Sequence, residues 1–114
     1  MLDTSPLSAA VERFADRLRA APQSRLQQGA AAVALDLARE LSVRAQRLEA
    51  PGEAPREMPD AGLFVVGDQV AVAGRDLAEA LRGGAGAPDM AKAPSELLDE
   101  AVSLVEQAEI RATR

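Results

Sequence analysis

AGLFVVGDQVAVAGRDLAEALR, residues 61–82, is the stretch of sequence on which the fold class depends. Read as a helix, it gathers apolar and small residues on one face at alternating spacings of four and three: Leu63, Gly67, Val70, Gly74, Leu77 and Leu81. Read as strands, residues 63–66 and 69–73 flank Gly67-Asp68, a dipeptide suited to a two-residue hairpin turn. We favour the helix, because the end of this stretch continues the stripe in phase and an isolated hairpin is marginal in a helical chain.

The residues before this stretch predict two helices joined by a short connection. Pro6 at the first helical position, with Ser5 as the cap, predicts a helix over about 6–21. Pro22 ends it, because proline disfavours the α conformation of the preceding residue. A second helix is predicted over 24–49, and the short joint indicates an antiparallel hairpin of the two. Their apolar stripes are Leu7, Val11, Phe14 and Leu18, and then Leu26, Ala30, Val33, Leu37, Leu41, Ala45 and Leu48.

The remaining segments complete a helical bundle. Three prolines and a glycine predict a loop over 50–60, and a glycine-rich linker is predicted over 83–94. A last helix is predicted over about 95–112, with the stripe Leu98, Val102, Val105 and Ala108. We therefore predict one all-α domain, a four-helix up-and-down bundle spanning 1–114. The alternative is a three-helix core with a fourth helix that is tethered or swapped onto a second copy.

The side chains that the chain lacks limit its chemistry. Among 114 residues there is no His, Cys, Trp or Tyr. This excludes thiolate and imidazole metal sites and Ser–His catalysis. The net charge is −5, and residues 51–114 hold six basic against twelve acidic side chains. Because the chain has few basic side chains to neutralise phosphates and few aromatic side chains to stack on bases, we expect no nucleic-acid partner. We also expect no cofactor.

The sequence also predicts where the protein resides. No apolar run approaches the ~20 residues that span a bilayer, so no membrane partner is expected. The first six residues lack the basic and apolar segments of a secretory signal, which predicts a cytoplasmic protein. Arginine far outnumbers lysine, since Lys92 is the only lysine, and this bias is typical of a GC-rich bacterial genome.

The small-residue face of 61–82 is the candidate interface. Glycine inside a helix costs about 1 kcal/mol relative to alanine, so we interpret Gly67 and Gly74 as points of close approach. Two interpretations stay open: contact between subunits, and tight packing inside one bundle. The function that we predict is a non-enzymatic interaction or regulatory protein, which acts through a helical surface on a protein partner or on itself as a homodimer.

An enzymatic alternative rests on two pairs of acidic residues. Asp76 and Glu79 share one helix face, and Glu96 and Asp99 share another, so together they could hold Mg²⁺ through oxygen ligands. The pairs resemble the motif of all-α nucleotide pyrophosphohydrolases of the MazG type, which implies Mg²⁺-dependent nucleotide hydrolysis. Asp76 stands where that family has Glu. We favour solvated helix faces instead, because roughly three such pairs arise by chance in a chain this acidic.

Overall fold

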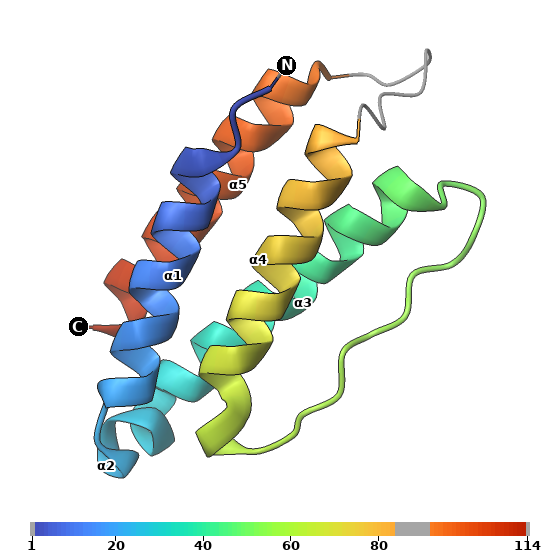
Figure 1. Ribbon diagram of the computed structural model, residues 1–114. Helices are drawn as coiled ribbons and strands as arrows, with labels where there is room; N and C mark the ends of the chain where they lie inside the picture. Colours follow the sequence, from blue (N-terminus) through green and yellow to red (C-terminus); the bar gives the residue numbers. More distant parts are fainter. Residues whose placement is uncertain (1, 84–91, 114) are drawn as a thin grey trace.

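The computed structural model describes residues 2–83 and 92–113 of the protein (Figure 1). Its long helices are α1 (Ser5–Ala20), α3 (Ala31–Glu49), α4 (Val66–Arg82) and α5 (Pro94–Ala112). The short helix α2 (Gln23–Arg25) and the π-helical turn η1 (Leu26–Ala30) precede α3, and the 3₁₀ turn η2 (Leu63–Val65) precedes α4. The described residues contain no strand, so the all-α prediction is confirmed and the hairpin alternative at 63–73 is wrong.

The four long helices pack around one core. Helix α4 contacts α1 and α3, and α5 contacts the same two helices. The predicted four-helix bundle is therefore confirmed, with α5 packed on α1 and α3 of its own chain. Most of the predicted linker 83–94 falls on residues 84–91, which lie outside the described residues.

Contacts along the helices give their directions. Arg82 at the end of α4 donates a hydrogen bond to the hydroxyl of Thr4, just before α1, so these two helices are antiparallel. Arg44 late in α3 pairs with Glu100 early in α5, so that pair is antiparallel too. The connection 50–62 runs back along α3, so that α3 and α4 start at the same end of the bundle (Figure 1). With this long return, α3 and α4 share a direction. Helices α1 and α5 also share one, since Glu109 late in α5 pairs with Arg17 late in α1.

Alanine and branched aliphatic side chains fill the core, with one aromatic ring at its centre. Phe14 is fully buried, as are Leu41 of α3, Val70 of α4 and Val105 of α5. The predicted stripes therefore face inward, although Val33, Leu48 and Val102 are only partly buried. Within the described part of the chain, no helix combines the length and the apolar content needed to cross a membrane.

Gly29 interrupts the helix predicted over 24–49. Its φ of 134° and ψ of −18° lie outside the helical region, in a backbone conformation that residues other than glycine rarely adopt. Leu26 and Ala30 on either side of this break are both buried. The break therefore lets the chain turn out of α1 while it keeps the apolar stripe on the core side.

The start of α1 also differs from the prediction. The helix begins at Ser5, and the hydroxyl of Ser5 does not cap it. Instead, the backbone N–H and the hydroxyl of Ser5 both donate to Oδ1 of Asp3, at 3.0 Å and 2.6 Å. These two bonds, the hydroxyl bond first, lower the pKa of the Asp3 carboxyl. The carboxylate of Asp3, and not the hydroxyl of Ser5, thus accepts a backbone N–H at the start of α1.

Candidate functional site

The small-residue face of α4 packs against α1 of the same chain. A Cβ atom at Gly67 would lie 3.1 Å from the carbonyl oxygen of Ala15, and one at Gly74 would lie 2.6 Å from both methyl carbons of Val11. The predicted interface residues Gly67, Val70, Gly74, Leu77 and Leu81 are all buried, and Leu63 is partly buried against the core. Because α1 covers the two glycines, the structure favours the interpretation of tight packing inside one bundle.

The two acidic pairs do not form a metal site. Asp76 and Glu79 are exposed on α4, and Glu96 and Asp99 are exposed on α5. Helices α4 and α5 each pack between α1 and α3, so the two pairs remain on separate helix faces. Across residues 2–83 and 92–113, no three acidic side chains are close enough to hold a metal ion.

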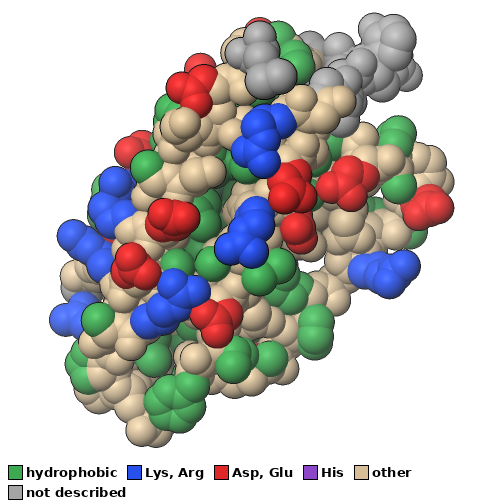
Figure 2. Space-filling model, viewed as in Figure 1, with side chains coloured by type: hydrophobic (Ala, Val, Ile, Leu, Met, Phe, Trp, Pro, Cys, Tyr) green, Lys and Arg blue, Asp and Glu red, His purple; other side chains and the backbone are tan. Residues whose placement is uncertain are grey.

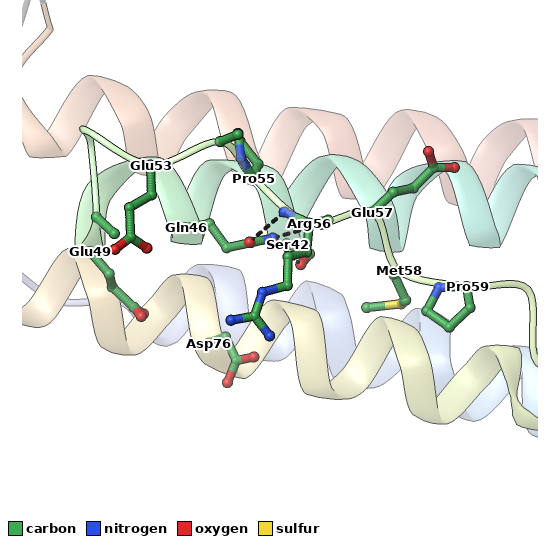
Figure 3. A pocket seen from close by; sticks show the side chains of 12 residues that line it. Ser42, Gln46, Glu49, Glu53, Pro55, Arg56, Glu57, Met58, Pro59 and Asp76 are labelled. Carbon is green, nitrogen blue, oxygen red and sulfur yellow. Dashed lines mark hydrogen bonds between the residues drawn. The ribbon is translucent and has the colours of Figure 1, made fainter.

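A hollow of about 540 Å³ lies between α3, α4 and residues 50–62, a segment that we call the strap (Figure 3). Its lining includes Glu49 at the end of α3, Glu53 and Arg56 on the strap, and Asp76 on α4. In Figure 3 the guanidinium group of Arg56 extends toward Asp76. Carboxylates and a guanidinium in such a lining can bind ions or polar groups.

Side chains from both helices bond to the backbone of the strap. Gln46 donates from Nε2 to the carbonyl oxygen of Arg56 at 2.9 Å and accepts the Arg56 N–H on Oε1 at 2.8 Å (Figure 3). Arg39 donates from Nε to the carbonyl oxygen of Met58 at 2.8 Å. Gln69 of α4 donates to the carbonyl oxygen of Pro59 at 2.9 Å. Four hydrogen bonds thus hold the backbone of the strap at residues 56, 58 and 59.

These contacts carry no signal in the sequence. Arg39 and Gln46 lie two turns apart on α3, beside its apolar stripe, and nothing local separates them from other polar helix residues. Their role depends on the strap lying alongside α3, which is a tertiary arrangement. The proline content of 50–60 predicted a loop correctly but not its path along the helix.

One nearly buried carboxylate links α1 to α5. Glu109 is 8% exposed, and its two oxygens lie 3.2 Å from Nε of Arg13 and 3.2 Å from Nε of Arg17. A buried carboxylate is stable only with such compensation, since transfer of an unpaired charge out of water is costly. These three residues therefore serve the docking of α5 on α1.

A second charged cluster joins α3 to the start of α5. Arg44 pairs with Glu40 one turn away at 2.8 Å and with Glu100 of α5 at 3.0 Å. Lys92 also donates a hydrogen bond to Glu100. The bonds from Lys92 and then Arg44 lower the pKa of the Glu100 carboxyl below its ordinary value. These ion pairs hold the beginning of α5 against α3.

Large apolar side chains remain exposed at the start of α4. Phe64 is 77% exposed, Val65 36% and Val72 48%, and we call these three residues the α4 patch. Figure 2 shows apolar side chains on the end of the molecule where α4 begins. The chain has two phenylalanines, and the other, Phe14, is fully buried. Phe64 is thus the most exposed of the large apolar side chains on the described surface.

Comparison with known proteins finds no matching family model, curated protein or solved structure.

Proposed function

We propose that this protein is a non-enzymatic interaction or regulatory protein that associates with a second copy of itself through the α4 patch. The observation that carries the proposal is the exposure of Phe64, together with the exposed Val65 and Val72. Full burial of one such side chain stabilises an assembly by about 1.5–3 kcal/mol, so an exposed aromatic ring favours association. Since the core consists largely of alanine and small aliphatic residues, it buries little area per residue, and a dimer would add to that burial.

The shape of the α4 patch suits a two-fold arrangement. Val65 is the N-cap of α4, and Val72 follows it by seven residues, which is about two helical turns. When two copies of α4 cross antiparallel about a two-fold axis, each Val65 faces the other copy's Val72. A symmetric contact needs such a self-complementary surface, because the same residues are used on both sides.

The charge inside this surface is compensated within each chain. Asp68 lies between Val65 and Val72, and its Oδ1 accepts hydrogen bonds from Nε and Nη2 of Arg19 at 3.0 Å and 2.7 Å. The bond to Asp68 is the main cause that raises the pKa of Arg19. A second copy that covers this face would therefore not bury an unpaired carboxylate, which is the usual obstacle to burying charged surface.

Sedimentation velocity tests the proposal directly. The native chain should sediment as a dimer at micromolar concentration, and Phe64→Asp should sediment as a monomer with unchanged helical circular dichroism. The matched control is Ile110→Asp on α5, since Ile110 is also exposed but lies outside the α4 patch, and it should remain dimeric. A monomeric native chain, or a dimer that Phe64→Asp leaves intact, would refute self-association through this patch.

A further inference from the structure

The strap is held mainly through its backbone. Gln46 bonds both the N–H and the carbonyl of Arg56, Arg39 bonds the carbonyl of Met58, and Gln69 bonds the carbonyl of Pro59. In each of these bonds, a side chain of α3 or α4 pairs with a main-chain atom of the strap. Contacts of this kind recognise an extended chain with little regard for its sequence.

One strap side chain supplies an apolar anchor. Met58 is partly buried and packs against the core, whereas Arg56 and Glu57 on the preceding positions are exposed. Methionine is unbranched and adapts to irregular spaces, so it can pack against the core without a closely shaped pocket. The side-chain contribution to recognition is thus one flexible apolar residue, supplemented by the 3.2 Å ion pair of Glu57 with Arg39.

The strap does not fill the space beside it. The hollow of about 540 Å³ extends along residues 53–59 and is bounded by Ser42 and Gln46 of α3 and by Asp76 of α4. No residue of the strap forms a regular helix or strand between 54 and 62. The side chains that hold the strap come from rigid helices, so the binding groups keep their places when the strap is replaced by another chain.

From these contacts we propose that the groove between α3 and α4 is a binding site for an extended peptide that carries an unbranched apolar residue, and that residues 54–59 occupy this site in cis. The groups that define the site are Arg39, Gln46 and Gln69, with the space that accepts Met58. The covalent connection gives the strap a high effective concentration, so the site is masked in the free protein. This site is distinct from the α4 patch, and the proposal does not depend on dimer formation.

Peptide binding in trans tests the masked site. The probe is a fluorescein-labelled peptide with the sequence of residues 53–60, EAPREMPD. In a full-length variant whose residues 53–60 are replaced by eight glycine and serine residues, fluorescence anisotropy should report saturable binding. The native chain should bind the same probe at least tenfold more weakly, because its own strap competes. A probe with Asp at the methionine position, and the loop variant that also carries Gln46→Leu, should each lose at least tenfold in affinity.

A second variant keeps the test decisive if the loop replacement unfolds. Met58→Asp in the otherwise native chain weakens the strap without altering the groove, so the probe should bind it at least tenfold more tightly than the native chain. Circular dichroism establishes that each variant retains its helices. The proposal is overturned if the folded variants show no saturable binding, or if the native chain binds the probe as tightly as they do.

Discussion

Gly74 of α4 lies directly against the side chain of Val11 of α1. A Cβ atom at position 74 would stand 2.6 Å from both methyl carbons of Val11 and 3.0 Å from its Cβ. Val11 is 3% exposed and β-branched, so its side chain has little freedom to turn away. The absence of a side chain at residue 74 therefore sets how closely α1 and α4 approach.

Gly74→Ala should destabilise the protein. Overpacking a tight contact costs about 1–3 kcal/mol, and the better helix propensity of alanine returns about 1 kcal/mol, so the free energy of unfolding should fall by up to about 2 kcal/mol. Urea denaturation followed by circular dichroism measures the change. Gly74→Leu, which would dissociate a dimer if this face lay between subunits, should instead disrupt the fold of the single chain.

The double variant Val11→Ala/Gly74→Ala is the matched control for this contact. Removal of the two methyl carbons makes room for the new Cβ, so the two changes together should cost at least about 0.5 kcal/mol less than their sum. Additive effects would show that the Gly74 contact with Val11 does not limit the approach of α1 and α4.

Gly29→Ala should destabilise the protein through the backbone alone. A Cβ atom at Gly29 meets no atom within 4 Å, so no clash is expected, but the φ of 134° is strained for alanine. Such strain costs about 1–3 kcal/mol, and the midpoint of urea unfolding should fall accordingly. Gly52→Ala serves as the comparison, because Gly52 also faces open space and has an ordinary φ. Equal stability of the two variants would contradict this account of the break before α3.

The contribution of Glu100 to stability should depend on pH. Hydrogen bonds from Lys92 and Arg44 lower the pKa of this carboxyl in the folded state below its ordinary value of 4.5. The folded state therefore favours the ionised form, so the contribution is present above the unfolded pKa and is lost as the pH falls through the folded pKa. We expect Glu100→Gln to lower the urea midpoint at pH 7 and to leave it close to that of the native chain at pH 3.

A variant on the same helix provides the control for the pH measurement. Asp99 is exposed, and no resolved hydrogen bond or ion pair among the described residues involves its side chain. Asp99→Asn should therefore shift the midpoint less than Glu100→Gln at pH 7. A Glu100→Gln deficit that is as large at pH 3 as at pH 7 would exclude the ion pairs as its cause.

The helices themselves could be predicted from local sequence. Prolines at 6, 22 and 94 stand at the starts and joints of helices, where their missing N–H groups cost least. The in-phase stripe of 61–82 favoured a helix over a hairpin, and α4 with its preceding 3₁₀ turn has that stripe buried. These features depend on backbone preferences and on a periodicity within one element, so one sequence is enough to show them.

The candidate site could be predicted only in part. The close-packed role of Gly67 and Gly74 was foreseen, but both the intrachain and the intersubunit interpretation fitted the same residues. The groups that bond the strap, Arg39, Gln46 and Gln69, carry no local signal, because their partners are backbone atoms that lie distant in the sequence. The exposure of Phe64 was likewise hidden, since an apolar residue next to a stripe is expected to join the core.

The sequence by itself determined that this chain is helical, roughly where its four long helices lie, and which catalytic and metal-binding chemistries its composition excludes. Only the tertiary structure decided which helices are neighbours, that the strap returns along α3, and that α1 covers the glycines of α4. The physical reason is the range of the interactions involved. Helix formation depends on residues three and four positions apart, whereas the choice among apolar faces depends on how all of them are buried together.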